Sequence, residues 1–179
     1  PKTTQNPDTY VNELSQQTVN AVLWYNTSAE NVYIYEQTYK MAAQMTENNM
    51  KNITNGKPLA VVLDIDETVL DNSPYMIDLI KNNNVFTEET WASWVQKEKA
   101  SALPGVEEYL KFCLERNIEV FYVSNRSIRY LEPTMRNMMN LNLPFADEMH
   151  IRLMQDTGDK TERRHAIENE YNVLMYIGD

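Results

Sequence analysis

Short runs of apolar, mostly branched residues alternate along the chain with segments whose apolar residues recur every three or four positions. The apolar runs are residues 59–63, 118–123, 149–153 and 173–177. Helical segments are predicted between them, one opening at Thr87, one running from Pro104 to a stop at Asn117, one through residues 133–140 and one from Asp159. Strands that alternate with helices favour parallel pairing with helices on both faces. The predicted fold class is α/β, a doubly wound parallel sheet.

The first 56 residues carry a helical pattern and precede the first predicted strand. One helix is expected over residues 10–26, and Thr27 followed by Glu30 is a capping-box pattern that predicts the start of a second, ending near Met50. The apolar stripe of this second helix is typical of packing against a main body. We therefore predict an N-terminal helical segment, residues 1–56, and a core domain, residues 57–179.

Charge and cysteine content narrow the function classes. Of the 179 residues, 26 are acidic and 16 are basic, which gives a net charge of −10. A polymer of nucleic acid held through its phosphates needs clustered basic residues, so this partner is not expected. The single cysteine, Cys113, excludes an internal disulfide and a thiolate metal site. An anionic substrate must then be captured by a local site.

The polar residues that follow the predicted strands carry the candidate chemistry, because ligands of open parallel sheets bind at the carboxyl ends of the strands. These residues are Asp64 and Asp66 after the first strand, Ser124 and Asn125 after the second, Lys160 at the last helix and Asp179 after the fourth strand. Two carboxylates placed together repel each other unless a hard cation such as Mg²⁺ lies between them. A serine hydroxyl and a lysine ammonium suit a phosphoryl group, and an aspartate can act as its nucleophile.

Four segments resemble the signatures of the class C acid phosphatases, the bacterial lipoprotein or secreted branch of the haloacid dehalogenase superfamily. Residues 62–75 (VLDIDETVLDNSPY) resemble the first signature, and residues 121–126 (FYVSNR) the second. Lys160 matches the lysine of the third motif, and residues 173–179 (VLMYIGD) resemble the start of the closing signature. The resemblance extends from the first helices to the last residue.

The resemblance implies roles for individual residues. Asp64 is expected to be the nucleophile and Asp66 the general acid and base, while Ser124 and Lys160 hold the phosphate. Asp64, Asp179 and the main-chain carbonyl of Asp66 are expected to bind Mg²⁺. The family hydrolyses phosphomonoesters, often 5′-nucleotides, and is exported or held by a lipid anchor, which implies an extracytoplasmic location. Its members continue past the last motif into a C-terminal segment, so the core is expected to be incomplete at Asp179.

Aromatic and basic residues near these motifs leave two interpretations open. Tyr75 and Trp91 either stack on a nucleobase or pack in the core, whereas core packing is favoured for Trp94. The four arginines near the later motifs are either solvated helix-face charges or residues that steer an anion toward the site. They are Arg126, Arg129, Arg163 and Arg164.

The leading hypothesis is a Mg²⁺-dependent acid phosphatase acting on small phosphomonoesters through an aspartyl-phosphate. The alternative is a catalytically silent, phosphatase-like binding or storage protein. A dehalogenase is disfavoured because it would not need an acid at position 66, while a phosphomutase stays open. The sequence does not indicate the oligomeric state.

Overall fold

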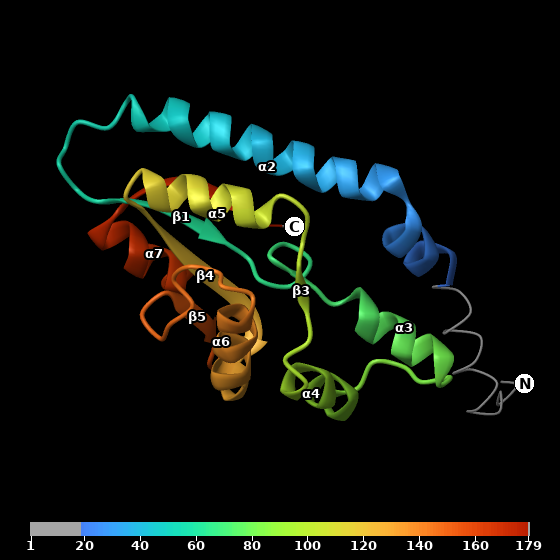
Figure 1. Cartoon of the computed structure of the whole chain (residues 1–179). Helices are drawn as coiled ribbons and strands as arrows, with labels where there is room; N and C mark the ends of the chain where they lie inside the picture. The colour runs from blue at the N-terminus through green and yellow to red at the C-terminus, as the bar shows by residue number, and fades with distance from the viewer. Residues whose placement is uncertain (1–18, 179) are drawn as a thin grey trace, which may run out of the picture.

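The computed structural model describes residues 19–178, and a four-stranded parallel sheet forms their centre (Figure 1). The strands are β1 (Leu59–Leu63), β4 (Ile118–Ser127), β5 (Ile151–Met154) and β6 (Asn172–Ile177), in the order β5-β4-β1-β6. Every neighbouring pair in this sheet is parallel. The predicted α/β fold class is confirmed, and each apolar run of the sequence contributes a strand.

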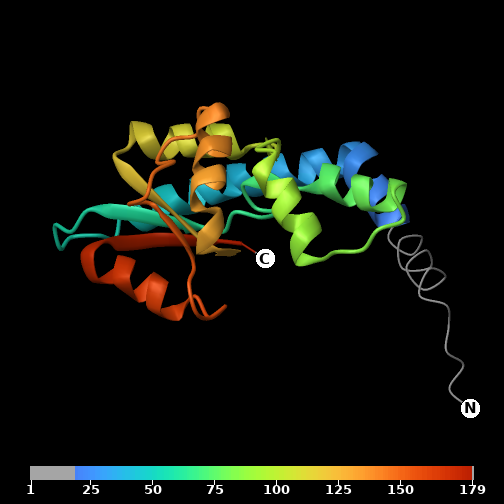
Figure 2. The same ribbon diagram turned by 90° about the horizontal axis from the view of Figure 1, so that it is seen from below.

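Helices cover both faces of the sheet. Alternate residues of β1 explain this arrangement: Val61 and Leu63 join the larger core, and Ala60 and Val62 join a smaller one. The larger core is shared with α2 (Ala29–Met50), α5 (Val106–Glu115) and α6 (Leu131–Asn140). The smaller core is shared with α7 (Thr161–Glu170), which lies on the opposite side of the sheet in Figure 2. A strand buried on both faces reads as a continuous apolar run, as observed.

The start of α2 differs from the expectation by one residue. Thr27 is the last residue of a preceding helical segment, residues 19–27, where its hydroxyl donates to the carbonyl of Leu23 over 2.7 Å. Ser28 is the N-cap instead, and its hydroxyl accepts from the backbone N–H of Asn31 at 2.9 Å. Residues 10–18 of the expected first helix lie outside the described residues. None of the helices within residues 19–178 has the length and apolar character needed to cross a membrane.

An insertion between β1 and α5 lies beyond the carboxyl end of β1. It contains β2 (Leu70–Asp71), α3 (Ser73–Lys81), α4 (Glu88–Gln96) and β3 (Ser101–Ala102), with β2 and β3 antiparallel. Thr87 caps α4 as predicted, whereas α3 and the two short strands were not predicted. In Figure 1, α3 and α4 lie side by side at the end of the molecule toward which β1 points.

Three other boundaries shift slightly. Pro104 lies before α5 rather than at its first position, because Gly105, with φ of 84°, is the N-cap. At the other end, Asn117, with φ of 54°, ends the turn after the helix. A short 3₁₀ turn, η1 (Ile128–Tyr130), precedes α6, which begins two residues before Pro133. Asp159 lies before α7, where its carboxylate accepts from the backbone N–H and hydroxyl of Thr161.

Candidate active site

Asp64 lies where the ends of β1 and β6 meet. Its backbone N–H donates to the carbonyl of Ile177 over 2.9 Å, and a Cβ on Gly178 would lie only 3.3 Å from the Cβ of Asp64. The Asp64 carboxylate accepts from the backbone N–H of Ile65 through Oδ1 and forms a short ion pair with Lys160 through Oδ2. The two paired side chains are only 15% and 16% exposed. The structure therefore brings together two predicted site residues that lie 96 positions apart in the sequence.

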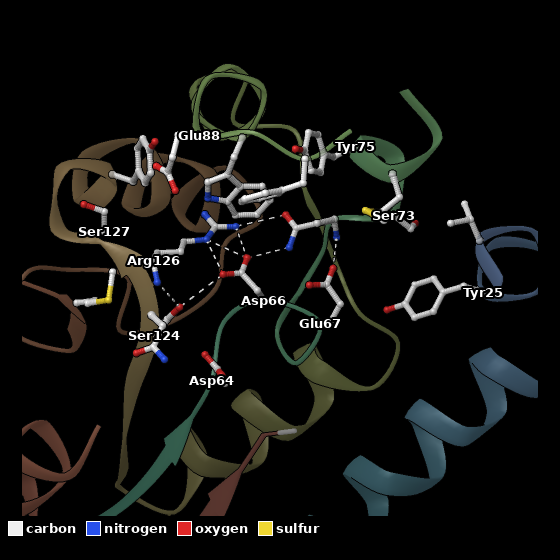
Figure 3. A pocket seen from close by; sticks show the side chains of 18 of the residues that line it. Tyr25, Asp64, Asp66, Glu67, Ser73, Tyr75, Glu88, Ser124, Arg126 and Ser127 are labelled. Carbon is white, nitrogen blue, oxygen red and sulfur yellow. Dashed lines mark hydrogen bonds and ion pairs between the residues drawn. The ribbon is translucent and has the colours of Figure 1, made fainter. Parts of the chain in front are cut away.

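Asp66 lies in the same hollow and is held mainly by Arg126 (Figure 3). Nη2 of Arg126 donates to Asp66 Oδ1 over 2.7 Å, and Nε donates to both oxygens over 2.9 and 3.0 Å. The amide of Asn72 also donates to Oδ1, over 2.8 Å. The carboxylate at this position is therefore paired and hydrogen-bonded from two sides.

Arg126 is not a solvated helix-face charge. The strand β4 continues to Ser127, where the sequence predicted an end at Val123, so Arg126 belongs to the strand. It is buried, and its Nη1 donates to the hydroxyl of Thr134 on α6 over 3.1 Å. Its burial depends on contacts with residues distant in sequence, and we find no local pattern that indicates it.

Ser124 and Asn125 lie in the last part of β4, beside the two aspartates. The Ser124 side chain is buried; its hydroxyl accepts from the backbone N–H of Arg126 at 3.1 Å and lies 3.5 Å from Oδ2 of Asp66. Arg163, on α7, holds this part of the strand by donating to the carbonyl of Ser124 over 2.6 Å and to the amide oxygen of Asn125 over 2.8 Å. Arg163 therefore stabilises the site, a role that neither interpretation of the arginines predicted.

The other two arginines lie at the periphery. Arg129 forms an ion pair with Glu88, and both residues line the pocket. The guanidinium of Arg164 lies 5.2 Å from the ring centroid of Tyr176 and packs over it. Neither contacts Asp64 or Asp66.

A pocket of about 870 Å³ opens over the aspartates. One wall is aromatic and comes from the insertion and from the helical segment before α2. The aromatic residues of this wall are Tyr25, Tyr75, Phe86 and Trp91. Phe86 and Tyr25 were missed, because nothing in their sequence positions connects them with the motifs.

The three aromatic residues considered earlier differ in exposure. Trp91 is partly exposed to the pocket, with its ring centroid 5.4 Å from that of Tyr75. Tyr75 also borders the pocket but is 95% buried, and its hydroxyl is hydrogen-bonded to Thr90 at 2.8 Å. Trp94 is buried, as predicted, and its indole N–H donates to Asn72 over 2.8 Å. Of these three side chains, Trp91 is the one best placed to meet a ligand.

Glu67 adds a carboxylate to the pocket wall beside Asp66. Burial, followed by the nearby Asp66 carboxylate, raises the pKa of Glu67 to about 7. Its Oε1 accepts from the backbone N–H of Asn72 at 3.1 Å, and its φ is 52°. Glu67 is nevertheless exposed to solvent as a whole residue, and it lines the pocket beside Asp66.

The donor set at the strand ends suits a hard divalent cation. Asp64 and Asp66 offer carboxylate and main-chain oxygens, the ligands that Mg²⁺ prefers. Within residues 19–178 no group of three or more His, Cys, Asp or Glu side chains converges. Asp179, the third predicted carboxylate, lies outside the described residues, but its neighbour Gly178 packs against Asp64.

The chain is similar to a known protein family and to solved structures. A family model described as the haloacid dehalogenase superfamily, subfamily IIIB (acid phosphatase), matches residues 2–179. The structure of the class C acid phosphatase from Bacillus anthracis with tungstate bound has a TM-score of 0.87 and 32% identity, covering 92% of this chain and 69% of that chain. A second structure of that phosphatase has a TM-score of 0.86 and 32% identity, covering 90% and 67%.

A curated plant protein is also similar. Acid phosphatase 1 of Solanum lycopersicum is 30% identical over 124 residues, which cover 66% of this chain and 49% of the relative. The chain thus spans about half the length of this curated relative.

Proposed function

The chain belongs to the subfamily IIIB acid phosphatases of the haloacid dehalogenase superfamily, and we propose that it hydrolyses small phosphomonoesters, including 5′-nucleotides, through an aspartyl-phosphate on Asp64. The observation that carries the proposal is the paired Asp64 and Lys160 at the carboxyl end of β1, with Asp66 and Ser124 beside them. A carboxylate nucleophile, a cation, a hydroxyl donor and a second carboxylate thus surround one small space.

Phosphate capture is the role of Lys160 and Ser124. The Lys160 ammonium neutralises one side of the anion, and the Ser124 hydroxyl donates from the end of β4. Arg163 keeps residues 124 and 125 of β4 in place through its two hydrogen bonds. Tungstate is a tetrahedral oxyanion like phosphate, and its presence in the Bacillus anthracis relative supports an oxyanion site in this fold.

Phosphoryl transfer takes place in two steps, transfer to Asp64 and hydrolysis of the aspartyl-phosphate. An oxygen of Asp64 forms a bond to phosphorus as the bond to the leaving oxygen breaks, and Asp66 gives that oxygen a proton. Asp66 then takes a proton from water, the water oxygen bonds to phosphorus, and the bond to Asp64 breaks. Inorganic phosphate leaves, and both aspartates return to their starting state.

Mg²⁺ is proposed as the cofactor. Asp64, the main-chain carbonyl of Asp66 and Asp179 would hold it, and it would neutralise the charge of the phosphoryl group and of the two carboxylates. The Lys160 ammonium and the buried Arg126 supply the remaining positive charge from the protein itself.

The substrate class follows from the aromatic wall. Trp91 lies 6.3 Å, centroid to centroid, from Phe86, so the two rings form an apolar surface beside the phosphate site. Stacking of a base on an aromatic ring is worth about 1 to 3 kcal/mol. We therefore favour 5′-nucleotides over small alkyl phosphates. We also propose, from the class C resemblance, that the enzyme acts outside the cytoplasm as an anchored lipoprotein or a secreted protein.

The test is phosphate release from a 5′-nucleotide and an aryl phosphate, at acidic and neutral pH, with Mg²⁺ and with chelator. We expect metal-dependent release that is lost in Asp64→Asn. Metal or phosphate binding by calorimetry without any release would favour the alternative, a silent binding or storage protein. Transfer of the phosphoryl group to a second alcohol without free phosphate would indicate a mutase.

A further inference from the structure

The two carboxylate oxygens of Asp66 have different surroundings. Oδ1 accepts three hydrogen bonds, from Nη2 of Arg126 over 2.7 Å, from Nε over 2.9 Å and from the amide of Asn72 over 2.8 Å. Oδ2 shares the Nε hydrogen at 3.0 Å and lies 3.5 Å from the hydroxyl of Ser124. A carboxylate oxygen offers two lone pairs, so Oδ1 is saturated. Oδ2 accepts only the shared Nε hydrogen and the long 3.5 Å bond from the Ser124 hydroxyl, so it is the less occupied oxygen and lies next to the phosphate-binding serine.

Arg126 is itself held firmly. Its side chain is only 2% exposed, and Nη1 donates to the hydroxyl of Thr134 on α6 over 3.1 Å. A further bond runs from Nη2 to the amide oxygen of Asn72 over 3.3 Å, and the guanidinium lies 5.4 Å from the ring centroid of Trp91. The rigid fork is therefore oriented by groups that do not belong to the reacting set.

The orientation of Asn72 is determined by Trp94. An indole N–H is a donor only, and it donates to Oδ1 of Asn72 over 2.8 Å. The amide nitrogen of Asn72 must then face Asp66, where it donates to Oδ1. Both donors to the saturated oxygen are thus fixed by buried partners from α4 and α6.

We propose that Arg126 is a positioning residue for proton transfer, which anchors Oδ1 of Asp66 so that Oδ2 gives and takes the proton at the leaving oxygen. The inference rests on the proposed function, because it assigns a role within that reaction. Arg126 acts through Asp66 and needs no contact with the leaving group. Removing it leaves the nucleophile Asp64 and its partner Lys160 in place, so the reaction should lose its proton transfer and keep its nucleophilic attack.

Leaving-group dependence separates this role from a general structural one. The alkoxide of a 5′-nucleotide needs a proton as it departs, whereas 2,4-dinitrophenolate leaves without one. We compare kcat/KM for the two substrates, because this constant reports phosphoryl transfer to the enzyme. For Arg126→Lys we expect a loss of roughly a hundredfold with the nucleotide, in the range of general acid catalysis, and a loss of about threefold or less with dinitrophenyl phosphate.

A second variant and a rescue experiment test the same role if Arg126→Lys does not fold stably. Thr134→Val preserves the shape of the buried side chain and removes only the hydroxyl that orients Nη1, so a smaller loss confined to the nucleotide is expected. Guanidinium added to Arg126→Ala should restore part of the nucleotide activity. Arg136→Lys is the control, because Arg136 is a half-exposed arginine on α6 whose ion pairs are with Glu98 and Glu132.

The outcomes are distinguishable. Equal losses with both substrates in Arg126→Lys and Thr134→Val would overturn the positioning role and indicate that Arg126 binds phosphate or supports the fold. Unchanged nucleotide activity in both variants would overturn it as well. If the unaltered protein releases phosphate from neither substrate, the proposed function itself fails, independently of Arg126.

Discussion

Replacing Lys160 with methionine removes the ammonium group that pairs with Asp64 while keeping a flexible side chain of similar length. Among the described residues, Asp64 would then keep one hydrogen-bond donor, the backbone N–H of Ile65 at 2.7 Å. A phosphate bound next to Asp64 would lose its nearest lysine. We expect the variant to fold and to bind and turn over phosphomonoesters poorly.

The size of the effect follows from the burial of the pair. Two unit charges 4 Å apart interact by about 1 kcal/mol in bulk water and by about 4 kcal/mol at an effective dielectric constant near 20. The Lys160 and Asp64 side chains are 16% and 15% exposed, so the second value is the more appropriate starting point. Removal of a single oxyanion donor costs roughly a hundred- to a thousandfold in rate, and we expect kcat/KM to fall by that amount.

The assay is phosphate release under saturating Mg²⁺, with Lys111→Met as the matched control. The Lys111 side chain is 75% exposed and pairs with Glu115 on the same helix, so its loss should change kcat/KM by less than about twofold. Lys160→Met activity within a few-fold of the unaltered protein would refute the reasoning, because it would mean that the pair is screened as in bulk water.

Further predictions concern three positions in the fold. Tyr39→Phe removes the buried 2.6 Å hydrogen bond to the carbonyl of Thr68 and should lower the free energy of unfolding by about 1 to 2 kcal/mol, measured in urea; an unchanged midpoint would contradict it. Gly105→Ala should cost about 1 to 3 kcal/mol in the same assay, because φ is 84° and the new Cβ would lie 3.1 Å from Cβ of Tyr39. Burial raises the pKa of the Cys113 thiol from 9.0 to about 12, so it should resist iodoacetamide at pH 8 unless unfolded. The thiol of the unfolded chain ionises at a lower pH than the thiol of the folded protein. The free energy of unfolding should therefore fall as pH rises from 9 toward 12, and the part of this loss that is due to Cys113 should be absent from Cys113→Ala.

The strands and the strand-end residues could be predicted because their signals are local. A strand buried on both faces needs a continuous apolar run, and β1 is such a run followed directly by Asp64. The pairing of Asp64 with Lys160, 96 residues away, follows from parallel topology, which brings polar residues of separate segments to the same edge. The parallel topology is therefore enough to predict that Asp64 and Lys160 lie at the same edge of the sheet.

The insertion and the arginines could not be predicted in the same way. The strands β2 and β3 have two residues each, too few for a period of two to be visible. The role of Arg126 depends on a carboxylate 60 residues earlier in the chain and on the hydroxyl of Thr134, so the residues around position 126 show only a run of polar side chains. Phe86 faces the pocket because of the path between α3 and α4, which no local pattern encodes.

The most direct test of the central claim is to trap the phosphoryl group on the protein. The enzyme is mixed with a phosphomonoester and Mg²⁺, quenched in acid within one turnover, digested and analysed by mass spectrometry, with Asp64→Asn treated in parallel. We predict a phosphoryl group on the peptide that contains Asp64, absent from the variant and lost on incubation with base. A protein that releases phosphate from its substrate with no phosphoryl group on Asp64 at any quench time would contradict the account.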